Sequence, residues 1–197
     1  MKNYFSLYPK WLFSLLIAIP DTHPILVFLI RFIWELPQTI LGFVILFLMM
    51  LFGMIKRIEF CRGAVVVQCR FRFGGFSIGQ YIFGDEKIKA DPSTGLFQHE
   101  YGHVLQSRKY GIIYLSKFGF PSLVSAIRSR NRSHDKHPVE QDANVRAKQF
   151  FEQKISNFQW NASYNPIDDQ IKPQKVKWFD YIPGHFPFAH LLMAFRK

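Results

Sequence analysis

The residues most suited to chemistry form an HExxH motif, His99-Glu100-Tyr101-Gly102-His103. Residues four apart on a helix share one face, so His99 and His103 are placed to bind one metal ion through their imidazole nitrogens. Glu100 lies one position after His99, where it can take a proton from the attacking water and return it to the leaving amine. The motif predicts a zinc-dependent hydrolase in which Glu100 is the catalytic base.

A catalytic zinc site takes three protein ligands, and the best candidate for the third is Glu140. Pro138 is well tolerated at the first position of a helix and predicts one that carries Glu140 and Asn144 on the same face. Asn144 would orient one of the histidines through its amide oxygen. The alternative ligands are His137, His134 and Asp142.

These motifs resemble a known class of enzymes. HEYGH followed by a downstream ExxAN is similar to the gluzincin zinc metallopeptidases, and to the ExxAD variant of membrane-associated peptidases. A closer resemblance is to small, functionally uncharacterised bacterial membrane proteins with WELPQ, a glycine-rich hairpin, HEYGHxxQS, a YL…G.PS segment and an ExxA[DN] helix. These elements occur here at residues 34–38, 74–83, 99–107, 114–122 and 140–144.

The resemblance covers most of residues 34–150 and implies a set of roles. His99, His103 and Glu140 would be the zinc ligands, with Glu100 as the base. Asn144 stands where aspartate is usual, which implies a weaker hydrogen bond to a ligating histidine.

The first third of the chain is its apolar part. Residues 36–55 contain no charged side chain, and about 20 helical residues reach the roughly 30 Å of a bilayer's hydrocarbon core. Lys56 and Arg57 follow at once, and cationic residues just beyond a span favour the cytoplasmic side. Shorter apolar runs at residues 11–19 and 25–34 predict an irregular first passage or interfacial helices. We therefore expect an integral protein of the cell membrane with a cytoplasmic catalytic domain.

The formal net charge is +11, from 25 Lys and Arg against 14 Asp and Glu. Topological bias and attraction to anionic headgroups account for this charge, and no nucleic-acid motif accompanies it. The expected partners are the lipid bilayer and a peptide or protein substrate, and nucleic acid is not expected. Cys61 and Cys69 cannot build a disulfide framework and are expected to be small buried hydrophobes.

Residues 58–83 have a β-rich pattern with a turn signal at Gly74 and Gly75. The pattern predicts strands at about 64–73 and 76–83. The two glycines would also support an edge strand that pairs with an extended substrate beside the catalytic base.

Helices are expected at about 95–109, around the HExxH motif, and from 138 to about 155. The predicted fold class is α+β, with N-terminal transmembrane or apolar helices, a small β-hairpin sheet and a zincin-like helical domain. Residues 1–55 would be the membrane-embedded anchor and residues 56–197 the metalloprotease domain. The candidates for an oxyanion stabiliser are Tyr181, His185 and His190, which lie in the aromatic C-terminal region.

The leading hypothesis is a membrane-bound, zinc-dependent metalloprotease that hydrolyses peptide bonds with a metal-activated water. The alternative is a non-catalytic, membrane-anchored zinc-binding protein, a pseudoenzyme or assembly factor with four protein ligands and a closed site. A third possibility keeps the hydrolase and moves its action to a non-peptide amide or ester.

Overall fold

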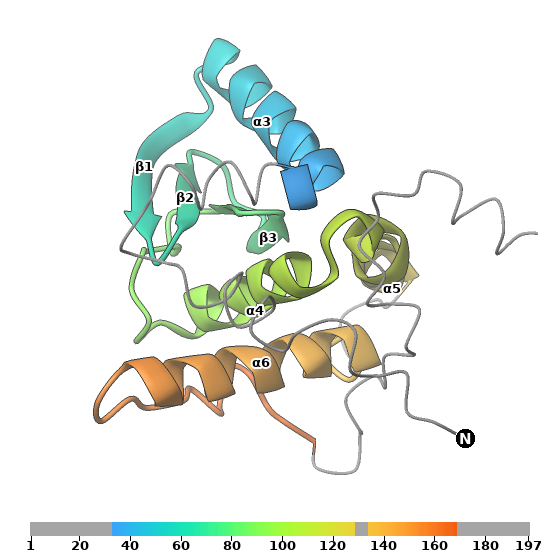
Figure 1. Ribbon diagram of the computed structural model, residues 1–197. Helices are drawn as coiled ribbons and strands as arrows, with labels where there is room; N and C mark the ends of the chain where they lie inside the picture. The colour runs from blue at the N-terminus through green and yellow to red at the C-terminus, as the bar shows by residue number, and fades with distance from the viewer. Residues whose placement is uncertain (1–32, 129–133, 169–197) are drawn as a thin grey trace, which may run out of the picture.

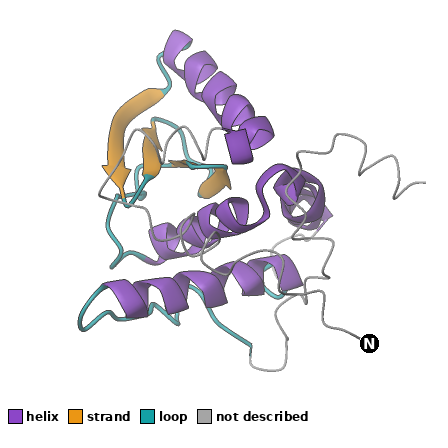
Figure 2. Ribbon diagram, viewed as in Figure 1, coloured by secondary structure: helices purple, strands orange, loops and turns teal. Residues whose placement is uncertain are grey.

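The computed structural model describes residues 33–128 and 134–168. The helices in these ranges are α3 (Leu36–Leu51), α4 (Gly95–Tyr110), α5 (Phe120–Arg128) and α6 (Pro138–Lys154). The strands are β1 (Ile55–Cys61), β2 (Ala64–Cys69), β3 (Gly75–Ile78) and β4 (Tyr81–Gly84). A 3-10 turn (Gly111–Ile113) and a π-helical turn (Leu115–Gly119) join α4 to α5. Figures 1 and 2 show an α+β arrangement in which α3 covers one face of the sheet, α4 covers the other, and α6 lies against α4.

The sheet is mixed and has the strand order β1-β2-β4-β3. β1 and β2 pair antiparallel, β2 and β4 pair parallel, and β3 pairs antiparallel with β4 at the edge. The predicted small hairpin sheet is therefore a larger and differently connected one. The hairpin turn that joins β3 and β4 contains Gly79 with φ of 60°, and the Gly74-Gly75 pair instead precedes the edge strand.

The two faces of the sheet support two separate apolar cores. Val66 and its same-face neighbours pack with Phe97 and Tyr101 of α4 and Phe151 of α6. Val67 points to the opposite face, as alternate residues of a strand do, and lies in the core beneath α3. The sheet therefore supports one side of α4, the helix that carries the HExxH motif.

The predicted membrane span at residues 36–55 is wrong. α3 ends at Leu51 after 16 residues. At roughly 1.5 Å per residue it measures about 24 Å, short of the roughly 30 Å of a hydrocarbon core. The chain then reverses through Gly53, whose φ is 63°, and continues from Ile55 as strand β1.

Within residues 33–128 and 134–168, no helix combines the length and the apolar character needed to cross a membrane. This finding contradicts the N-terminal part of the predicted fold and the predicted integral placement in the cell membrane with a cytoplasmic domain. The apolar run at 11–19, and all but the last two residues of the run at 25–34, lie outside the described residues. The predicted contact with a lipid bilayer is not tested and stays a prediction.

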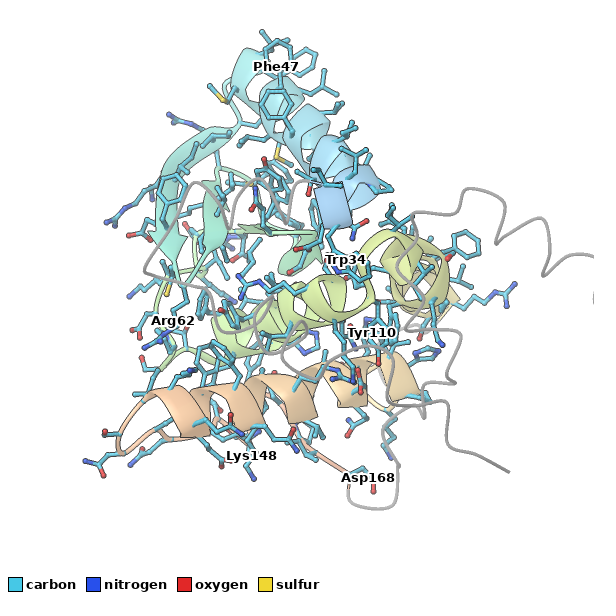
Figure 3. All side chains as sticks on the ribbon, viewed as in Figure 1. Trp34, Phe47, Arg62, Tyr110, Lys148 and Asp168 are labelled. Atoms are coloured by element: carbon cyan, nitrogen blue, oxygen red, sulfur yellow. The ribbon has the colours of Figure 1, made fainter. Side chains whose placement is uncertain are left out.

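α3 nevertheless has an apolar outer surface. Ile45, Leu46 and Met49 pack on the sheet. The exposed side of the helix carries only large apolar side chains: Ile40, Leu41, Phe43, Val44, Phe47, Leu48, Met50 and Leu51. Phe47, labelled in Figure 3, is 50% exposed.

Polar contacts fasten the start of α3 to the end of α4. The indole N–H of Trp34 donates to the carbonyl oxygen of Arg108 at 2.9 Å. The Gln38 side-chain amide donates to Ser107 Oγ at 3.1 Å and to the Gly111 carbonyl oxygen at 2.8 Å. Ser107 Oγ also donates to the buried carboxylate of Glu35. Figure 3 shows Trp34 at this junction, between the first turn of α3 and α4.

Candidate metal centre

The predicted helices are confirmed as α4 and α6, and they cross in close contact. A Cβ atom placed on Gly102 would lie 2.2 Å from the carbonyl oxygen of Ala143. No side chain larger than hydrogen fits at position 102 at this separation. The crossing therefore depends on Gly102 and brings the HExxH face of α4 against the Glu140 face of α6.

At this crossing, His99, His103 and Glu140 form a group that can hold a metal ion, with ligand atoms all within 4.8 Å of one another. Glu140 Oε2 lies 3.2 Å from His99 Nε2 and 2.9 Å from His103 Nε2. Glu140 is only 1% exposed and His103 only 7%, whereas His99 is partly accessible. Two imidazoles and one carboxylate are a donor set typical of metal sites with an open coordination position.

The outer nitrogen of each imidazole contacts a side-chain amide oxygen. His99 Nδ1 lies 2.8 Å from Asn144 Oδ1, and His103 Nδ1 lies 2.9 Å from Gln106 Oε1. An amide oxygen only accepts hydrogen bonds, so both Nδ1 atoms carry hydrogen and both Nε2 atoms face the metal position. Asn144 thus has the geometry that its predicted orienting role requires.

Gln106, near the end of α4, is a further residue of the site. Its side chain is fully buried, and its amide N–H groups donate to the Val139 carbonyl oxygen at 2.8 Å and to Asp142 Oδ2 at 2.9 Å. Arg146 in turn holds Asp142, with distances of 2.6 and 2.7 Å. This chain fixes the amide so that its oxygen faces His103.

Glu100 stands beside the metal group. Ser77 of β3 donates a hydrogen bond to Glu100 Oε2 at 2.7 Å, and Glu100 is 4% exposed. A Cβ on Gly75 would lie 2.9 Å from Glu100 Oε1, so a side chain at position 75 would displace this carboxylate from its present position. Burial lowers the pKa of both His99 and His103, Glu140 raises it, and the charge of Glu100 raises it further.

The alternative ligands have other contacts. Asp142 pairs with Arg146, and His137 is the N-cap of α6, where its Nδ1 accepts the Val139 N–H at 3.3 Å. His134 Nε2 lies 3.7 Å from Glu140 Oε1, outside the metal group. The tail residues proposed as oxyanion stabilisers, Tyr181, His185 and His190, lie outside the described residues.

The cysteines also lie apart from the metal group. Cys69 is fully buried in the sheet and Cys61 is partly buried. Burial raises the pKa of both thiols, which disfavours the thiolate form that binds metals.

The charges of the metal-free site are coupled. Burial alone would lower the pKa of His103, but the charge and hydrogen bond of Glu140 outweigh burial and raise it to about 9. Burial alone would raise the pKa of Glu140, but the charge of His103 and the hydrogen bonds from both imidazoles hold it well below its ordinary value. In the metal-free protein the protonated form of His103 is thus favoured beside the carboxylate of Glu140.

This coupling predicts the pH dependence of the metal-free protein. The contribution of His103 to stability is complete below its ordinary pKa of 6.5 and is lost as the pH rises through about 9. The contribution of Glu140 is present above its ordinary pKa of 4.5 and is lost as the pH falls through its lowered folded-state value. We expect the Tm of chelator-treated protein to fall as the pH is raised through 9, and Glu140→Gln to flatten this fall. A Tm that is constant or rising across this range would contradict the coupling.

Comparison of the chain with models of protein families, with curated proteins and with solved structures finds no significant match. Function is therefore inferred from the side chains of the site.

Proposed function

We propose that this protein is a zinc-dependent metallopeptidase that hydrolyses peptide bonds, with His99, His103 and Glu140 as ligands. The observation that carries the proposal is the placement of Glu100. Its carboxylate is nearly buried and held by Ser77, and it lies outside the ligand group although Glu100 directly follows His99 on α4. A purely structural metal site has no need of such a group.

The donor set fits zinc, which commonly binds two imidazoles and one carboxylate in hydrolases. When bound, zinc would polarise the scissile carbonyl group and lower the pKa of water towards about 7. Glu100 would take the proton from the attacking water and then deliver it to the leaving nitrogen. Asn144 and Gln106 would hold the two imidazoles in the tautomer that binds metal.

The edge strand supports a peptide as the substrate class. β3 pairs with β4 on one side only, and each of its residues is partly accessible. An extended peptide can add to such an edge through main-chain hydrogen bonds. Gly75 and Ser77 of this strand contact or border Glu100, so a peptide added to β3 would run beside the base.

The test is the metal content of purified full-length protein, followed by hydrolysis of fluorescein-labelled casein with and without chelator. We expect about one zinc per chain in the wild type, loss of zinc in His103→Ala, and loss or weakening in Glu140→Ala. His137→Ala is the matched control, because it removes a nearby histidine outside the metal group and should keep the zinc. Wild-type protein without metal after zinc supplementation, or casein hydrolysis that survives chelation, would refute the proposal.

A further inference from the structure

The two oxygen atoms of Glu140 have separate partners. Oε2 faces the Nε2 atoms of His99 and His103 at 3.2 and 2.9 Å. Oε1 accepts a hydrogen bond from Ser122 Oγ at 2.6 Å. A hydroxyl-to-carboxylate hydrogen bond of this length is among the stronger kinds in proteins. The two oxygens of this carboxylate therefore face different groups: Oε2 faces the metal position, and Oε1 is hydrogen-bonded to Ser122 of α5.

Ser122 comes from a helix that the apolar cores hold only weakly. None of the residues of α5 is fully buried, and its large apolar side chains Phe120, Leu123 and Ile127 are exposed. Ser122 and Ser125, three residues apart, instead face α6 and the segment before it, where Ser122 contacts Glu140 and Ser125 Oγ lies 3.2 Å from His134 Nδ1. The hydrogen bond from Ser122 to Glu140 has two possible roles. It anchors α5 to α6, or it determines which oxygen of Glu140 faces the metal position.

We propose that Ser122 is a positioning residue that keeps Glu140 a one-oxygen metal ligand. This inference rests on the metal binding of the proposed function. A carboxylate binds metals through one oxygen or through both, and a catalytic site must keep a position open for water and substrate. By holding Oε1, Ser122 leaves Oε2 as the single donor and keeps that position from being filled by the second oxygen.

The experiment uses full-length protein loaded with Co²⁺, whose visible absorption reports the number and geometry of its ligands. Acetohydroxamate is the probe of the open position. In Ser122→Ala we expect cobalt to remain bound, its absorption to weaken as the coordination number rises, and acetohydroxamate to bind about 10-fold more weakly. Ser122→Thr keeps the hydroxyl and should restore both properties.

Ser125→Ala is the comparison variant, because it removes the other serine of the same helix face, whose hydroxyl contacts His134 and not Glu140 directly. His134 Nε2 lies 3.7 Å from Glu140 Oε1, so a smaller effect than that of Ser122→Ala is expected. An unchanged spectrum and unchanged acetohydroxamate affinity in Ser122→Ala would overturn the inference while leaving the metal site intact. Equal changes in Ser122→Ala and Ser125→Ala would show that the serines only anchor α5, and would overturn it as well. Wild-type protein that binds no cobalt would overturn the proposed metal site itself, so the two failures are distinguishable.

Discussion

Glu100→Gln is expected to lower kcat for peptide hydrolysis by on the order of 10³-fold while the zinc content stays at the wild-type level. Glutamine keeps the size of the side chain and an oxygen that accepts the Ser77 hydrogen bond, so the site should keep its shape. It lacks a carboxylate that can take a proton from water. Because Glu100 lies outside the ligand group, the metal affinity should not depend on its charge to a comparable extent.

The measurement is steady-state hydrolysis of labelled casein together with elemental analysis of the same samples. Glu152→Gln, an exposed glutamate of α6 that pairs with Lys148 at 3.9 Å, is the matched control and should behave as the wild type. A Glu100→Gln variant as active as the wild type would remove Glu100 from its role. Loss of both zinc and activity would instead make Glu100 a ligand.

Gly102→Ala is expected to cause the largest loss of stability of any single methyl addition at the site. The new Cβ would lie 2.2 Å from the Ala143 carbonyl oxygen, an atom of the backbone that cannot rotate away. Alanine is favoured over glycine in a helix by about 1 kcal/mol, but forcing two packed helices apart costs more than this. We expect a net loss of at least about 2 kcal/mol in the free energy of unfolding, with weaker zinc binding as α4 and α6 separate.

Urea denaturation of metal-free protein and competition with a zinc chelator measure the two effects. Gly119→Ala is the matched control, because the nearest atom to its new Cβ would be a Leu115 side-chain carbon at 3.4 Å, an ordinary contact. A Gly102→Ala variant as stable as the wild type would show that the helix crossing is looser than the structure has it.

The metal-ligand group was within reach of sequence reasoning because its signals are local. The HExxH spacing fixes two ligand candidates on one helix face, and Pro138 marks the start of the helix that carries Glu140. These positions are determined by helical periodicity within a few turns. The ligand atoms of His99, His103 and Glu140 come together because Gly102 packs against Ala143. The sequence shows Gly102 and Ala143 only as two small residues.

The residues around the ligands were not predictable in the same way. Ser77, Gln106 and Ser122 are ordinary polar residues, and their partners are 23, 36 and 18 positions away in the chain. Only the folded arrangement pairs them with Glu100, Asp142 and Glu140. The one available signal was Gly75, a glycine of the edge strand beside Glu100, and by itself it predicts only a site for an extended substrate.

The membrane span predicted at residues 36–55 was wrong for a different reason. A helix that lies on a sheet and a helix that spans a bilayer both require long runs without charge, so hydropathy alone does not separate them. Gly53 and the strand that begins at Ile55 were the local signs that the helix ends early. The parallel pairing of β2 with β4 was likewise not predictable, because the residue pattern of a strand does not specify which strand pairs with it.

The attachment of α3 to α4 makes the helix that carries the HExxH motif dependent on a distant part of the chain. The last carbonyl groups of any helix lack partners within it, and here the Trp34 indole, 74 positions away, supplies one of the missing donors. Closing the long loop between Trp34 and Arg108 costs chain entropy, which the packing of α3 on the sheet and the polar contacts of the junction must offset. The position of α4, and with it that of His99 and His103, therefore depends partly on a segment that contributes no residue to the candidate metal group.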